Sequence, residues 1–460
     1  MPTDNLHKSS EPIRSVHLTN YYHPASGGVK ANYDRLLLAA NRRRRHVSLI
    51  VPGEESRVEK FGEFGKIYFV AAPSSPFVDR RYRLMMPWHY MLTDSPIRRI
   101  LLDEKPRIVE VYDNYSLTFL AGMTRMGWFH KLDRPMFVYF TGERFDTIFK
   151  TFVAGGAFGN WFSRRFMGNF NLAMFDFFIA NSPFVAEEIL ESVKKDHNPG
   201  RSDWFFEKCW KFLKASPRPF EDRVAICPRG VDTDMFSPNR RSAVIRRDIC
   251  SEFGVPDDCV LLMSSTRLSP EKNIELLPKI VKILANEATD YRLLVAGAGP
   301  KEEWLREESI RTFPGKIVLT GHLDKSKLAD LYANVDVFIH PNPREPFGNV
   351  GLEAMASGAA IVVPNSGGVL TYADEDNSWT VNADAASFAE AIKEAASNHK
   401  MRESKVENAL CTARASSNDA AIDRLFETYD RMYKEFSRWQ STVINETNVR
   451  LPQSSSTLHG

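Results

Sequence analysis

The feature that most constrains this chain is an alternation of short β-branched runs with helical patterns, and it occurs twice along the sequence. In the first half, runs such as HVSLIVP, RIVEVYD and MFVYFTG are separated by helical stretches. The second half repeats the alternation with VLLMSS, YRLLVAG, KIVLTG and AAIVVPN. Strands that alternate with helices are typical of parallel sheets covered by helices. Because 460 residues also exceed what one hydrophobic core organises, the pattern predicts two Rossmann-like α/β domains.

The domain boundary is expected in CPRGVDTDMFSPNRR, where proline and glycine interrupt the pattern after the strand RVAIC. We therefore predict an N-terminal domain over residues 12–230 and a C-terminal domain over residues 235–400. Residues 419–438 form an amphipathic stretch that needs a docking surface. Residues 441–460 lack apolar periodicity and are predicted to be a disordered tail. Ligands of open α/β sheets bind at the carboxyl ends of strands, which places the site in the crevice between the domains.

Charge, cysteine content and apolar run length exclude several classes of protein. A net charge of +2 gives no global field that would recruit nucleic acid. The five cysteines form no C-x-x-C pair, which is typical of free thiols in a reducing compartment. No apolar stretch approaches the ~20 residues of a membrane span. We expect a cytoplasmic protein whose contact with a membrane, where it occurs, is peripheral.

The stretch VFIHPNPREPFGNVGLEAMASG carries the most chemical information. A strand ends near His340, a proline-rich loop holds Glu345, and a helix that starts near Asn349 carries Glu353. Both carboxylates can then face the crevice, where they suit sugar hydroxyls because they offer only acceptors. Free amides near Gly348 and Asn349 make the helix start an anion site. One segment therefore supplies groups for both parts of a nucleotide sugar.

Two further segments add cations and close-approach positions. SSTRLSPEKNIELL places Arg267 just after a strand and Lys272 at the start of the next helix. Two cations there can stabilise the charge that grows on a departing diphosphate. Gly27 and Gly28 lie at the first strand-to-helix turn, where the absence of a side chain lets the backbone approach a sugar or phosphate.

These residues resemble glycosyltransferase family 4, the retaining group-1 enzymes of GT-B fold. The resemblance rests on PREPFGNVGLEAMASGAAIVVPNSGG together with RLSPEKN, LLVAGAGP, GHLDKSKLADLY and SGGVKAN, and it covers nearly all of residues 14–397. It implies two Rossmann-like domains that face a central crevice, with the acceptor on the N-terminal domain and the nucleotide sugar on the C-terminal one. It also implies that the helix over residues 419–438 crosses back onto the N-terminal domain.

The resemblance assigns roles residue by residue. Glu353 is expected to bind the donor ribose, Glu345 the donor hexose, and Arg267 with Lys272 the diphosphate. Phe347, Gly348 and Asn349 are expected to contact the sugar and phosphate, and the backbone of His322 and Leu323 the base. Many family members carry a histidine after the strand that matches MFVYFTG, whereas this chain continues as Phe140-Thr141-Gly142-Glu143-Arg144.

The implied activity is transfer of a hexose, with retention, from a UDP- or GDP-sugar to a glycan, glycolipid or other hydroxyl acceptor. Neither a metal ion nor a cofactor is expected. Asp232-Thr233-Asp234 spells the D-x-D of metal-dependent glycosyltransferases, but at a domain junction such carboxylates usually cap a turn. Two alternatives stay open: a GT-B phosphorylase or epimerase, and a non-catalytic nucleotide-sugar-binding protein.

Two basic features have two interpretations each. Arg42 to Arg45 form a run of four arginines, and residues 204–214 mix bulky aromatics with Lys208, Lys211 and Lys214. A charge run is usually a solvated face and an aromatic helix is usually buried, and we favour this interpretation. The alternative is a patch that contacts an anionic membrane.

Overall fold

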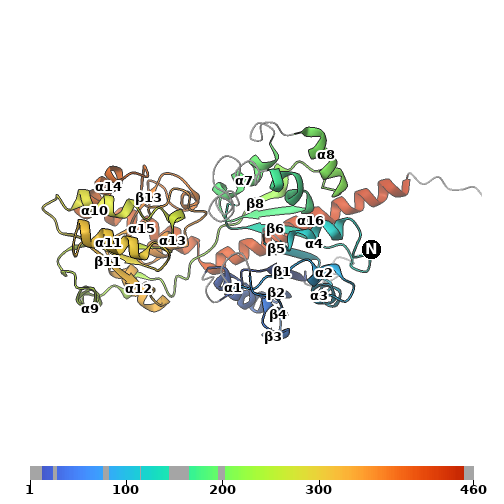
Figure 1. The fold of residues 1–460 in the computed structure, drawn as a ribbon, viewed down its shortest axis with the longest axis horizontal. Helices are drawn as coiled ribbons and strands as arrows, with labels where there is room; N and C mark the ends of the chain where they lie inside the picture. Colours follow the sequence, from blue (N-terminus) through green and yellow to red (C-terminus); the bar gives the residue numbers. More distant parts are fainter. Residues whose placement is uncertain are drawn as a thin grey trace, which may run out of the picture.

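The computed structural model describes residues 13–23, 28–75, 82–113, 116–144, 165–194 and 202–449, with the backbone alone for residues 441–449. The chain forms two sheets, each covered by helices, which lie side by side along the long axis of the molecule (Figure 1). Every neighbouring strand pair but one is parallel. The predicted α/β class with two Rossmann-like sheets is confirmed.

The N-terminal sheet contains eight strands. In sheet order they are β3 (Arg57–Phe61), β4 (Gly65–Ala71), β2 (Val47–Gly53), β1 (Ser15–Thr19), β5 (Ile108–Tyr112), β6 (Met136–Thr141), β7 (Phe177–Ala180) and β8 (Val224–Ile226). The strand β3 pairs antiparallel with β4 at the edge, and the sequence analysis did not predict it. Its exposed, charge-rich sequence RVEKF has no apolar alternation, as is common for edge strands.

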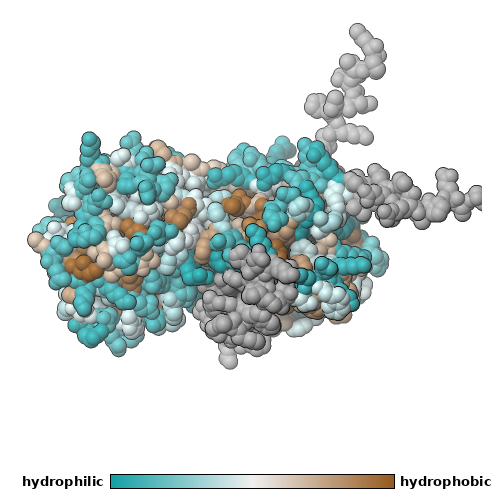
Figure 2. Space-filling model, turned by 90° about the horizontal axis from the view of Figure 1, so that it is seen from above, coloured by the Kyte–Doolittle hydropathy of each residue, from teal (hydrophilic) through white to brown (hydrophobic). Residues whose placement is uncertain are grey.

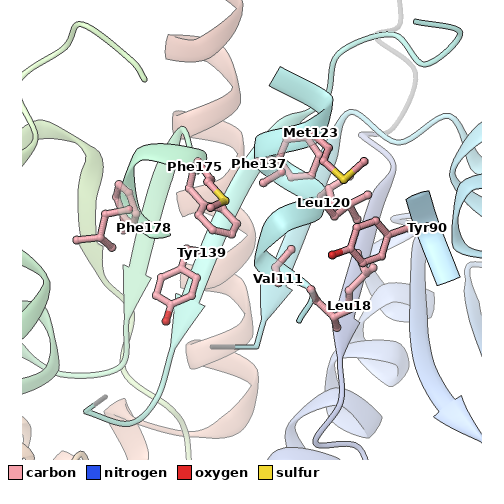
Figure 3. Packing of buried hydrophobic residues seen from close by; sticks show 14 of the residues in the cluster. Leu18, Tyr90, Val111, Leu120, Met123, Phe137, Tyr139, Phe175 and Phe178 are labelled. Atoms are coloured by element: carbon pink, nitrogen blue, oxygen red, sulfur yellow. The ribbon is translucent and has the colours of Figure 1, made fainter. Parts of the chain in front are cut away.

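Helices cover both faces of this sheet. They are α1 (Gly28–Arg43), α2 (Trp88–Met91), α3 (Pro96–Glu104), α4 (Thr118–Arg125), α7 (Pro183–Val193) and α8 (Asp203–Phe212). The central strands β1 and β5 are buried on both sides, so successive side chains enter different cores. Figure 3 shows one of these cores, in which Phe137 and Tyr139 of β6 pack with Phe175 and Phe178 near β7.

The C-terminal sheet contains six parallel strands. In sheet order they are β11 (Ile317–Gly321), β10 (Tyr291–Ala296), β9 (Val260–Ser265), β12 (Val337–Ile339), β13 (Ala360–Pro364) and β14 (Trp379–Val381). Its helices are α9 (Ala243–Phe253), α10 (Leu276–Leu284), α11 (Glu302–Thr312), α12 (Lys325–Asn334), α13 (Asn349–Ala356), α14 (Ala385–Ser397) and α15 (His399–Ala415). The carboxyl ends of β9 and β12 are adjacent, because these strands are neighbours in the middle of the sheet.

The last helix, α16 (Asn418–Val449), runs from the C-terminal domain along the N-terminal one (Figure 1). Its apolar residues at helical spacing, Phe426, Tyr429, Met432 and Phe436, are buried in a core with α1 and the N-terminal strands. The helix extends past the predicted end at residue 438 and into the stretch predicted to be a disordered tail. Residues 450–460 of that tail lie outside the described residues.

The arginine run binds this crossing helix. The ion pairs are Arg42 with Asp419, Arg43 with Asp423, and Arg45 with Asp430. The Arg45 pair is bidentate, at 2.8 and 2.6 Å, and its guanidinium also lies 4.6 Å from the ring centroid of Phe426. Three of the four arginines therefore pair with α16. Arg42 and Arg43 are still more than half exposed, as expected for a solvated charged face.

A buried carboxylate anchors the same helix from within. Glu110 of β5 is 3% exposed and accepts hydrogen bonds from the hydroxyls of Tyr429 and Tyr33. Nδ1 of His17 lies 3.0 Å from the same carboxylate. A buried charge needs such partners, since each missing hydrogen bond leaves its desolvation uncompensated.

On the face seen in Figure 2, the surface of both domains is mostly hydrophilic, and apolar residues form small separate patches. Within the described part of the chain, no helix is both long and apolar enough to cross a bilayer. The five cysteines are free thiols, as the sequence predicts.

Tyr429→Phe should lower stability, because it removes a hydroxyl donor from the buried Glu110 carboxylate. We expect a loss of about 1–3 kcal/mol, measured as a fall in the thermal unfolding midpoint. The matched control is Arg42→Ala. The side chains of Arg42 and its partner Asp419 are both more than half exposed, so the loss of stability should be about 0–1 kcal/mol. Equal effects of the two substitutions would contradict the anchoring role of Glu110.

Candidate functional site

Lys272 lies between β9 and α10 in a tight 3-10 turn over Pro270–Lys272. The prediction that it begins the next helix is wrong, since α10 begins at Leu276. Asn273 ends the turn with a left-handed φ of 53°, a conformation that asparagine tolerates better than most residues. Its Nδ2 donates to the carbonyl oxygen of Pro341 at 2.8 Å. This bond ties the Lys272 turn to the loop that holds Glu345.

Glu345 and Lys272 form a closely held ion pair at the carboxyl ends of β9 and β12. Nζ of Lys272 donates to Oε1 and Oε2 of Glu345 at 3.1 and 2.9 Å, and Nδ2 of Asn342 donates to Oε2 at 3.0 Å. Burial by itself raises the pKa of Glu345, but the Lys272 charge and these hydrogen bonds outweigh it and lower the pKa to about 2. Glu345 is therefore a carboxylate at neutral pH and acts as an acceptor of hydrogen bonds, not as an acid.

His340 completes this cluster. It is 2% exposed, and its Nε2 lies 3.9 Å from Oε2 of Glu345. Burial lowers the pKa of His340 to about 4, so the ring is neutral. Among the described residues its Nε2 has no hydrogen-bond partner. A buried ring nitrogen without a partner, beside a charged pair, is a position from which a bound ligand can be contacted.

The helix α13 begins directly after this loop. Gly348 caps it with φ at 80°, and a methyl group there would lie 3.2 Å from Cγ of Glu345 and from the hydroxyl of Tyr372. Glycine is therefore required for both conformation and space. The Oδ1 atom of Asn349 is buried and has no partner within the described chain. The unpaired amides of the first helical turn give this end of α13 the properties of an anion site. The Asn349 oxygen can only accept, so it suits a hydroxyl of the ligand.

The side chain of Phe347 is buried, and its expected contact with the sugar and phosphate stays a prediction. It is 3% exposed and its ring packs 5.3 Å from the ring of Tyr372 in the C-terminal core. Its side chain is thus turned away from the site, and only its backbone can meet a ligand.

Glu353 lies one turn further along α13 and is partly exposed. Burial raises the pKa of Glu353 to about 7, while the charge of Arg35 and the hydroxyl of Tyr332 act in the opposite direction. Arg35 belongs to α1 of the N-terminal domain, so a charge from the other domain acts on Glu353.

Three other predicted residues, Arg267, His322 and Leu323, lie just beyond strand ends. Arg267 is exposed just beyond β9, and among the described residues it makes no ion pair. His322 is exposed and Leu323 partly buried just beyond β11. Gly27 lies outside the described residues. Asp232 accepts a hydrogen bond from the amide of Met235 at 3.0 Å, which is the turn role predicted for it.

The N-terminal domain meets this site at two points. A methyl group at Gly28, the first residue of α1, would lie 3.6 Å from Nδ2 of Asn349. The hydroxyl of Ser182 donates to the carbonyl oxygen of Pro346 at 2.5 Å. Glu143, just after β6, is exposed at this junction and lies in the electrostatic field of Lys272.

Sequence reasoning missed His340 and Asn342 as parts of the site. Their signal was present, because both are polar residues that directly follow the buried strand β12, and polar residues at that edge of a parallel sheet face the ligand region. Ser182 carried no comparable signal, since the contact joins residues 164 positions apart.

Comparison with known proteins agrees with this geometry. Residues 246–410 match the family model described as glycosyl transferases group 1, and this range contains Arg267, Lys272, Glu345 and Glu353. A GDP-mannose-dependent alpha-(1-6)-phosphatidylinositol dimannoside mannosyltransferase of Mycobacterium tuberculosis is 26% identical over 385 residues, which cover 83% of this chain and 87% of the relative.

A shorter match is closer in sequence. A GDP-mannose-dependent alpha-mannosyltransferase of Mycolicibacterium smegmatis is 34% identical over 146 residues, covering 32% of this chain and 35% of the relative. Among solved structures, a glycosyltransferase from Rickettsia africae superposes with a TM-score of 0.66 at 16% identity, over 92% of this chain and 100% of that one.

The two Rossmann-like domains have the GT-B fold. Within that fold class, the chain carries a group 1 glycosyltransferase domain and is a transferase that uses a nucleotide-sugar donor.

Glu353→Gln should stabilise the ligand-free protein at alkaline pH. The folded state raises the pKa of Glu353 from 4.5 to about 7, so it binds the proton more tightly than the unfolded chain does. Ionisation of Glu353 therefore costs stability progressively as the pH rises from about 4.5 to 7. The thermal midpoint of the variant should exceed that of the wild type at pH 8, and the gap should shrink toward pH 5. A gap that is constant with pH would show that Glu353 does not titrate in this range.

Proposed function

We propose that this chain is a retaining, metal-independent hexosyltransferase of glycosyltransferase family 4, with GDP-mannose as its donor and a glycan or lipid-linked hydroxyl as its acceptor. The observation that carries the proposal is the joining of Lys272 and Glu345 beside the start of α13. The two mannosyltransferase relatives use GDP-mannose by name, which supports that choice of donor.

In this proposal the C-terminal domain binds the donor from several sides. Glu353 accepts hydrogen bonds from the ribose hydroxyls, and the backbone at His322 and Leu323 holds the base. The diphosphate lies at the amides of Gly348 and Asn349, because a helix N-terminus favours negative charge.

The hexose lies against Glu345, whose low pKa keeps it an acceptor for sugar hydroxyls. Lys272 and Arg267 stabilise the diphosphate as the bond to the anomeric carbon breaks. Charge that grows on a leaving group is best stabilised by cations that are already in place. The ion pair with Glu345 holds Lys272 in position before the donor arrives. No protein nucleophile is required, since a phosphate oxygen of the leaving group takes the proton of the acceptor hydroxyl on the same face.

The two alternatives predict other behaviour. A non-catalytic binding protein would bind the nucleotide sugar without turnover, and a phosphorylase or epimerase would consume phosphate or release free nucleotide without an acceptor product. The intact cluster of Lys272, Glu345 and Glu353 favours a transferase.

The first test is turnover. We expect the wild type to consume GDP-mannose in the presence of EDTA and to form an α-linked product, as seen by NMR of the anomeric proton. Lys272→Ala should lower kcat about 100-fold or more, because it removes a cation from the developing charge, whereas Lys279→Ala on the exposed face of α10 should leave kcat unchanged. Activity that vanishes with EDTA, or a β-linked product, would refute the proposed mechanism.

We also propose that α8 places the acceptor domain on an anionic membrane surface. Trp204, Phe205 and Phe212 are 65%, 43% and 71% exposed, and Nζ of Lys208 lies 4.0 Å from the ring centroid of Trp204. Cations attract anionic headgroups, and aromatic rings settle at the boundary of the bilayer.

The same helix also has a buried side. Cys209 is buried, and Trp210 packs against the N-terminal core with its Nε1 donating to the carbonyl oxygen of Gly168 at 2.9 Å. The interpretation of an aromatic helix as buried therefore holds for one face of α8 and fails for the other.

Flotation with liposomes tests this surface. The wild type should float with vesicles that contain phosphatidylserine and stay behind with phosphatidylcholine alone. Trp204→Ser with Phe212→Ser should abolish flotation and keep the thermal midpoint, because both side chains are exposed. Trp128→Ser, an exposed tryptophan beyond α4, is the matched control and should float normally. Unchanged flotation of the double variant would exclude α8 as the contact.

A further inference from the structure

Arg229 lies in the junction between the two domains, in the CPRGVD segment that follows β8. This segment is held next to the second interdomain connection, which leads into α16. The amide of Val231 donates to the carbonyl oxygen of Ser416 at 2.9 Å, and the amide of Asn418 donates to that of Val231 at 2.8 Å. The backbone that carries Arg229 is therefore fixed where the domains join.

The guanidinium of Arg229 is directed toward two glycine turns of the N-terminal domain. A methyl group would lie 3.6 Å from its Nη1 at Gly28 and 2.7 Å from its Nη2 at Gly142. In the orientation of the Asn32 amide that satisfies its hydrogen bonds, Oδ1 of Asn32 accepts from Nε of Arg229 at 2.9 Å and from Nη1 of Arg229 at 3.2 Å. The 2.7 Å approach means that Gly142 leaves room for this side chain, whereas 3.6 Å at Gly28 is an ordinary contact. Asn32 of α1 orients the guanidinium.

The charge of Arg229 acts on the Glu143 carboxyl group, but no described carboxylate pairs with Arg229 directly. Among the described residues Arg229 forms no ion pair, although it is partly buried. Together with Arg35 and Glu110 it lines a pocket between α1, the junction and α16. A partly buried cation without a counter-ion is costly unless an anion is supplied from outside.

The position of Arg229 indicates which anion this is. A methyl group at Gly28 would lie 3.6 Å from Nη1 of Arg229 and 3.6 Å from Nδ2 of Asn349. The guanidinium is therefore close to the N-terminus of α13. The anion bound at α13 in the proposed function is the donor diphosphate.

We infer that Arg229 is a third cation of the diphosphate site, contributed by the domain junction, and that it binds the phosphate that carries the sugar. This inference rests on the proposed function. In the transfer step the bond between the anomeric carbon and that phosphate oxygen breaks, and the electron pair stays on the oxygen. The acceptor oxygen forms the new bond, and its proton passes to the phosphate. Arg229 donates hydrogen bonds to the phosphate that gains the charge.

Binding of GDP and GMP tests the inference, because only GDP has the second phosphate. By isothermal titration, Arg229→Gln should weaken GDP binding about tenfold or more and leave GMP binding unchanged. Arg229→Lys should restore part of the GDP affinity, since it keeps the charge without the planar fork. Arg240→Gln is the matched control, because Arg240 lies in the same interdomain stretch but pairs with Asp330 at 2.7 Å.

Unchanged GMP binding also shows that the variant is folded. If GDP binding is unchanged in Arg229→Gln, or if GDP and GMP weaken equally, the inference is wrong while the proposed function stands. If the wild type binds no nucleoside diphosphate, neither GDP nor UDP, the proposed function and the inference both fail.

Discussion

The structure depends on the way the two domains are tied together at their junction. A single short segment after β8 would leave two Rossmann-like domains free to separate. Here the chain crosses a second time, and the two crossings are hydrogen-bonded to each other at Val231, Ser416 and Asn418. The second crossing continues as α16. Arginines 43 and 45 form ion pairs with its surface, and the buried Glu110 accepts a hydrogen bond from its Tyr429. The site between the domains can be assembled from both because this connection is fixed.

Next to its ion pair, the site contains polar atoms that have no hydrogen-bond partner in the described chain. Lys272 and Glu345 neutralise each other, whereas the polar atoms of His340 and Asn349 that lie next to them have no partner in the described chain. The ionised form of Glu353 is costly, and Arg229 forms no ion pair among the described residues. These features reduce the stability of the empty protein, and a ligand that combines a polyol with a diphosphate would satisfy all of them at once. Such a balance is typical of binding sites, where stability is given up for function.

Much of the fold could be predicted from the sequence, because the apolar runs of the parallel strands are short, buried on both faces and separated by helical patterns. The edge strand β3 was missed since it has no apolar alternation. The start of α10 was misplaced because the left-handed Asn273, which inserts a separate turn around Lys272, has no distinctive local signal. The meeting of Lys272 and Glu345 at neighbouring strand ends could be anticipated from residue type and position. The partner of the arginine run could not, since Asp419, Asp423 and Asp430 are about 380 residues away in the chain.

The central claim is that the donor nucleotide lies between the domains at the start of α13. A crystal structure with GDP bound tests it most directly. The account predicts the diphosphate within hydrogen-bond distance of Lys272, Arg267 and the amides of Gly348 and Asn349, with the ribose hydroxyls on Glu353. GDP bound elsewhere, or with its diphosphate directed away from α13, would contradict the account.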